Sequence, residues 1–175
     1  MRGANPKEAV EDFLRPLRRL ISCVTPRIPN ARGGYYPSDI HHTVVIGDGQ
    51  PIPLARLGRL KLRFAHHYRI LRASGERRQW EVRTTGYFYS LDDSDDQEII
   101  AYHWHPERSS PIRFPHLHLG AGADCRREEL ITAHCPTGLI SVSDFLRLAI
   151  MDFGVEPLRA DWRQVFSETQ RDFEL

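Results

Sequence analysis

Apolar residues recur at three- and four-residue steps along residues 6–24, a spacing that places them on one face of a helix. Asn5 followed by Pro6 is typical of a helix start, because an asparagine side chain can cap the first turn and proline fits the first helical position. Pro16 lacks the amide hydrogen that a helix interior uses, so we expect a kink or an interruption there. The pattern predicts an N-terminal helical segment that ends in the Pro- and Gly-rich loop 26–38.

Residues 43–119 change to the two-residue alternation of β-strands. The stretches with this alternation, or with β-branched and aromatic side chains, are 43–46, 60–71, 80–91, 98–105 and 113–119. The acidic run 92–96 predicts a hairpin loop between two of them. Because consecutive strands with short connections pair as neighbours, we expect an antiparallel meander of about four to five strands.

The last part of the chain returns to helical spacing. Residues 141–173 hold two apolar helical patterns, the first capped by Ser141 or Ser143 and the second starting after Pro157. The predicted fold class is therefore α+β, with the antiparallel meander packed against N- and C-terminal helices. The length of 175 residues fits a single domain over 1–175.

Composition narrows the classes of function. The sequence has no stretch of about 18 apolar residues and no secretory leader, which predicts a soluble, cytoplasmic protein without a membrane partner. Three widely spaced cysteines favour neither a disulfide framework nor a cysteine-based zinc site. A net charge of +1 argues against a protein that coats nucleic acid, although it allows a local basic cleft.

Four of the nine histidines lie within residues 101–120, as the His-x-His pairs His103/His105 and His116/His118. In a strand, alternate side chains point to one face, so the members of each pair share a face. If the two strands pair and bury their large apolar residues in one core, all four imidazoles face the same way. This patch is the candidate site.

Acid–base chemistry on a phosphodiester is the function that the patch favours. An imidazole with a pKa near the ordinary value of about 6.5 can take a proton from an attacking hydroxyl, while another delivers one to the leaving oxygen. The four histidines are then the catalytic residues of a nuclease that needs no metal or other cofactor. The candidate substrate-binding residues on nearby strands and loops are Arg113, Arg108, Arg83, Arg63, Tyr87 and Tyr89.

Two alternatives stay open. In the first, His103, His105, His116 and His118 bind a divalent metal, zinc, iron or manganese, in a hydrolase or an oxygenase. The shortage of nearby carboxylates, with Glu107 the only one close to the pairs, weighs against this alternative. In the second, the patch lies inside a protein interface and the chain is a non-catalytic interaction component.

The order of motifs over about residues 59–153 is also informative. A long strand ending in GYFYSL precedes an acidic loop, a strand ending in AYHWHPE, the segment PHLHLG and an amphipathic helix. This order resembles the TumE-type toxin family of bacterial type II toxin–antitoxin systems. The resemblance implies an endoribonuclease toxin that acts on RNA and is inhibited by a cognate helix-turn-helix antitoxin encoded nearby. The chain departs from the family at Trp104-His105, where members typically have Asp-Asn.

Overall fold

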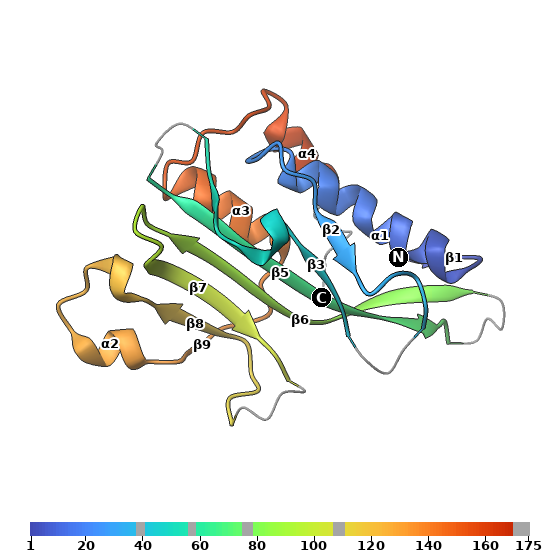
Figure 1. Cartoon of the computed structure of the whole chain (residues 1–175), viewed down its shortest axis with the longest axis horizontal. Helices are drawn as coiled ribbons and strands as arrows, with labels where there is room; N and C mark the ends of the chain where they lie inside the picture. The colour runs from blue at the N-terminus through green and yellow to red at the C-terminus, as the bar shows by residue number, and fades with distance from the viewer. Residues whose placement is uncertain (38–40, 56–58, 75–78, 107–110, 170–175) are drawn as a thin grey trace.

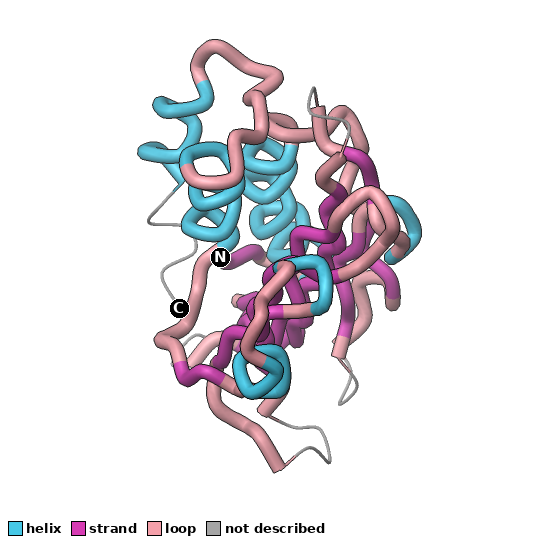
Figure 2. The backbone as a smooth tube through the Cα atoms, turned by 90° about the vertical axis from the view of Figure 1, so that its left-hand side faces the viewer, coloured by secondary structure: helices cyan, strands magenta, loops and turns pink. Residues whose placement is uncertain are grey.

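The computed structural model describes residues 1–37, 41–55, 59–74, 79–106 and 111–169. Helices pack on one face of an antiparallel sheet, as Figures 1 and 2 show from two sides. The predicted α+β class is confirmed.

The centre of the sheet is the predicted meander. Its strands are β5 (Lys61–Arg72), β6 (Trp80–Asp92), β7 (Glu98–Trp104) and β8 (His116–Leu119), each antiparallel to the next. The predicted run 43–46 corresponds to β3 (His42–Val45), which pairs with β5. Shorter strands that the sequence pattern does not predict extend the sheet: β1 (Arg2–Gly3), β2 (Asn30–Arg32), β4 (Ile52–Pro53) and β9 (Cys135–Pro136).

The helices form the second layer. α1 (Pro6–Ile21) is capped by Asn5, whose side chain accepts a hydrogen bond from the Glu8 amide, and it continues through Pro16 without the interruption considered above. The C-terminal helices α3 (Val142–Met151), which Ser141 caps, and α4 (Trp162–Thr169) pack beside α1. α2 (Glu128–Thr132) lies apart from them, next to β8. None of the described helices combines the length and the apolar character needed to cross a bilayer.

Strand alternation gives the two faces of the sheet different roles. Phe64, Tyr68 and Tyr89 point toward the helices, where Tyr68 packs on Phe13 and Tyr89 on Phe145. The next residue along each strand points the opposite way. The face opposite the helices therefore carries Ala65, Phe88, His103 and His116, which are register partners in one row across four strands.

Candidate functional site

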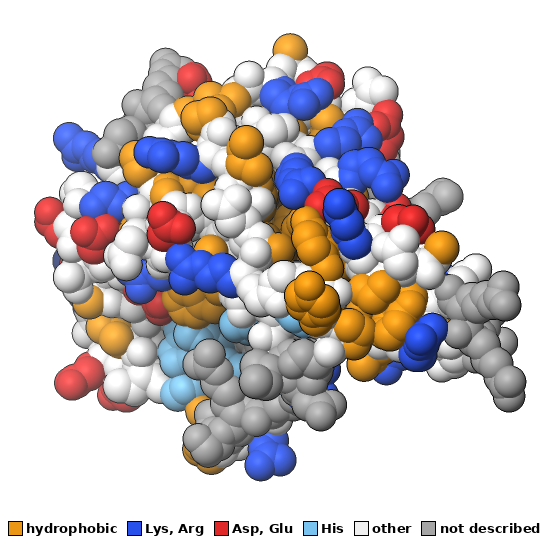
Figure 3. Space-filling model, turned by 45° about the vertical axis from the view of Figure 1, so that its right-hand side comes forward, with side chains coloured by type: hydrophobic (Ala, Val, Ile, Leu, Met, Phe, Trp, Pro, Cys, Tyr) orange, Lys and Arg blue, Asp and Glu red, His pale blue; other side chains and the backbone are white. Residues whose placement is uncertain are grey.

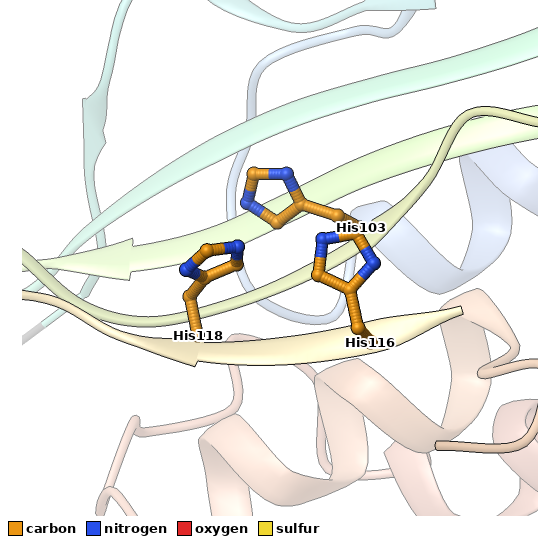
Figure 4. Close-up of side chains that lie close together, drawn as sticks. All are labelled: His103, His116 and His118. Atoms are coloured by element: carbon orange, nitrogen blue, oxygen red, sulfur yellow. The ribbon is translucent and has the colours of Figure 1, made fainter. Parts of the chain in front are cut away.

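Three imidazoles converge on this opposite face of the sheet. His103 on β7 lies directly across from His116 on β8, and His118 is two residues further along β8. Directly opposed residues of an antiparallel pair share a face, which is why the rings meet. Figure 4 shows them directed toward a common space, and each offers a nitrogen atom within 4.8 Å of those of the other two.

Two further histidines flank these three. The His105 ring centroid lies 5.9 Å from that of His103 and 5.7 Å from that of His116. The His134 ring centroid lies 4.2 Å from that of His118 and 5.2 Å from that of His116. The two pairs predicted from the sequence therefore do come together, and they are joined by His134, which the sequence pattern did not single out. Figure 3 shows histidines gathered at one place on the surface, with basic side chains beside them.

Hydrogen bonding leaves nitrogen atoms of this cluster ready to bind a ligand. Nδ1 of His116 lies 2.8 Å from the Phe114 carbonyl oxygen, so Nδ1 carries a proton and donates it, and in the neutral ring the lone pair is then on Nε2. Nε2 of His103 is buried and has no hydrogen-bond partner among the described residues. Buried polar atoms in proteins are normally satisfied, so an orphaned imidazole nitrogen aimed into a cluster points to a missing partner.

The electrostatics of the cluster favour the neutral form of two of its imidazoles, His103 and His118. Burial, reinforced by the neighbouring His118 and His116, lowers the pKa of His103 to about 3. Burial, with His134 and His116 nearby, lowers the pKa of His118 to about 4. Neutral imidazole is the form that binds metal ions.

The donor set defines which ions fit. All members of the convergent set are histidines, and it contains no carboxylate among the residues the structure describes. Imidazole nitrogens suit zinc, copper, iron and nickel, whereas magnesium, calcium and manganese prefer oxygen ligands. Nitrogens bound to one tetrahedral zinc ion lie about 3.3 Å apart, so the three nitrogens, which lie within 4.8 Å of one another, would move closer together to hold one ion.

The arginines predicted to bind substrate take different places. Arg63 lies on the same face as the histidines, in the row that ends at His118, and its Nη2 donates to the Asp92 carboxylate at 2.8 Å. Arg83 is at the other end of β6 and pairs with Glu81. Arg113 is exposed in the segment before β8, and Arg108 falls outside the described residues.

The expectation for Tyr87 and Tyr89 needs correction. Both side chains are buried in the core on the helix side of the sheet, where their rings stack at 4.8 Å. The Tyr87 hydroxyl accepts a hydrogen bond from the Ile140 amide, which ties the chain before α3 to the sheet. The two tyrosines share a face, as alternation predicts. That face packs against the helices, so their rings lie in the core and do not join the histidine patch.

A groove adjoins the cluster on the same face. It has a volume of about 400 Å³ and is lined among others by Arg63, Ala65, His67, Phe88 and His103. His105 also borders it, so the groove and the histidine cluster are continuous.

Comparisons of the chain with known protein families, with curated proteins and with solved structures gave no match.

Proposed function

We propose that the chain is a metal-dependent hydrolase in which His103, His116 and His118 hold one zinc ion. The observation that supports this most directly is the convergence of the three imidazoles, with Nε2 of His103 buried and unpartnered among the described residues. The Phe114 carbonyl fixes the His116 ring in the orientation and tautomer that a ligand needs.

A set of three neutral ligands favours hydrolysis. Zinc held by three protein ligands keeps an open position and lowers the pKa of a bound water to about 7. Neutral imidazoles leave the charge of the ion uncompensated, which strengthens this effect. Non-haem iron oxygenases use a carboxylate together with two histidines, and the convergent set described here has none. His134, exposed beside His118, lies where a group can pass protons between the site and solvent.

The ribonuclease toxin implied by the sequence resemblance would use the same patch differently. A metal-independent mechanism needs one protonated imidazole as the acid, yet burial lowers the pKa of His103 to about 3 and that of His118 to about 4. For these two imidazoles, the low pKa values suit binding of a metal ion better than the role of the acid. The RNA substrate, the cognate helix-turn-helix antitoxin and a cytoplasmic location stay predictions.

Metal content tests the proposal. Purified protein, dialysed against zinc and then against buffer, is expected to hold one zinc per chain by elemental analysis. His103→Ala, His116→Ala and His118→Ala each remove a ligand. Removing only the hydrogen-bond partner of a ligand typically lowers metal affinity by roughly 10- to 100-fold. Loss of the ligand itself should therefore lower the zinc affinity by more than that. His41→Ala is the matched control, because His41 contacts Thr85 and His67 outside the cluster.

The same proteins separate the two mechanisms. Parent protein without bound metal, or cluster variants that hold as much zinc as the parent, would contradict the metal centre. RNA cleavage that is lost in His116→Ala and His118→Ala but survives a chelator would instead establish the metal-independent nuclease.

A further inference from the structure

The groove beside the histidine cluster has a largely apolar floor, and a basic side chain and an imidazole flank it on β5. Its floor follows the row Ala65, Phe88 and His103, in which each residue is the register partner of the next. Arg63 and His67 stand two residues to either side of Ala65 on β5. Neighbouring strands lie about 4.8 Å apart, so the floor extends roughly 10 Å from His103 to Ala65.

Arg63 brings a positive charge to the groove. The Asp92 carboxylate is fully buried, accepting hydrogen bonds from the Ser90 hydroxyl at 2.7 Å and from Arg63 at 2.8 Å. The Arg63 side chain is 35 % exposed and lines the groove. Of the two charged groups, only the Arg63 guanidinium therefore faces the groove. The buried Asp92 carboxylate holds this guanidinium in place before a ligand binds.

We propose that this groove binds the part of the substrate that lies next to the reacting bond, and that this part is a single flat ring carrying a carboxylate or a phosphate. The inference rests on the proposed function, because it assigns a substrate class to the same site. The anionic group lies against Arg63, the ring covers Ala65 and Phe88, and the reacting bond reaches His103.

The lining selects this class of ligand. The small Ala65 beside the half-buried Phe88 ring leaves an apolar space with an aromatic side, which suits a ring. The described lining contains a guanidinium and no carboxylate, so an anion gains an ion pair there and a cation gains none. A volume of about 400 Å³ is in the range of small-molecule sites and holds one substituted ring.

Calorimetric titration of the zinc-loaded protein with phenyl phosphate, benzoate and benzyl alcohol tests the proposal. Both anions should bind at least about tenfold more tightly than the neutral alcohol, since a charge-assisted hydrogen bond is worth that much. Arg63→Lys keeps a cation beside the buried Asp92 but removes the planar fork, and Ala65→Leu fills the floor. Each variant should bind both anions about tenfold more weakly while holding as much zinc as the parent.

The matched controls are Arg83→Lys and Ala121→Leu. Arg83 lies in the same sheet and pairs with Glu81, and Ala121 is exposed. Both should bind the anions as the parent does. Unchanged anion binding in folded Arg63→Lys and Ala65→Leu overturns the inference and leaves the metal centre standing. Anion binding that depends on Arg63 and Ala65 in a protein that takes up no zinc supports the groove and overturns the proposed hydrolase.

Discussion

At the scale of single residues, His66 and His67 are neighbours on β5 with opposite surroundings. His66 faces the helices, and its ring nitrogens lie 2.6 Å from the Tyr89 hydroxyl and 3.0 Å from the Thr84 hydroxyl. His67 faces the groove and is hydrogen-bonded to Thr43. Strand alternation places the two imidazoles on opposite faces of the sheet, and the helices that cover one face make His66 a core residue while His67 lines the groove.

The buried His66 should make the fold sensitive to acid. Burial lowers its pKa to about 3 from 6.5, so its neutral form stabilises the fold fully above pH 6.5, and this stability is lost as the pH falls toward 3. Between pH 7 and pH 5 the linkage amounts to about 2 kcal/mol of unfolding free energy. His66→Gln keeps polar atoms near Tyr89 and Thr84 but does not titrate.

Urea unfolding of both proteins at the two pH values, in a chelator, checks this. His103 and His118 then contribute equally to both proteins, and the loss of stability on acidification should be smaller in the variant by about that 2 kcal/mol. Equal losses in the two proteins would refute a role for His66.

At the scale of elements, the long strands and α1 were predictable because their signals are local. Helical spacing and the Asn5-Pro6 pair define α1, and alternation defines β5 to β8. Long-range pairing was not predictable. β9 consists of two residues held by pairing with β8, and this pairing brings the preceding His134 onto the cluster.

Partner residues also decide where charge can be buried. Asp92 starts an acidic run that predicts a loop. Asp92 is instead the last residue of β6, and its side chain is fully buried. Ser90 and Arg63 make this possible by satisfying both carboxylate oxygens. Likewise, alternation predicted that Tyr87 and Tyr89 share a face, but which face meets the helices depends on packing that local sequence does not contain.

The start of α1 gives a prediction at this scale. Asn5 accepts from the Glu8 amide at 3.0 Å and donates to the Glu8 carboxylate at 2.7 Å, a reciprocal cap. Asn5→Ala should lower the free energy of unfolding by about 1 kcal/mol, whereas Asn5→Ser, which keeps a capping oxygen, should lose less than half of that. Urea denaturation measures both variants, and equal losses would mean that the cap contributes nothing specific.

At the scale of the whole molecule, one face of the sheet forms the core and the other carries most of the histidines. The helices α1, α3 and α4 cover one face with an aromatic and aliphatic core. Seven of the nine histidines gather on or beside the other face: His41, His67, His103, His105, His116, His118 and His134. A sheet stiffened from one side is a rigid support for the three proposed ligands, and the Phe114 carbonyl before β8 orients the His116 ring.

Zinc bound at this support should stabilise the whole fold, because the unfolded chain does not hold the three ligands together. At a free zinc concentration 100 times the dissociation constant, the gain is about 2.7 kcal/mol, which raises the melting temperature of a chain of this length by roughly 5 to 10 °C. Thermal unfolding followed by circular dichroism, with zinc and then with a chelator, measures the shift. It should vanish in His103→Ala and persist in His41→Gln, whose histidine lies on the same face but outside the cluster. A shift of equal size in both variants would place the zinc elsewhere on the molecule.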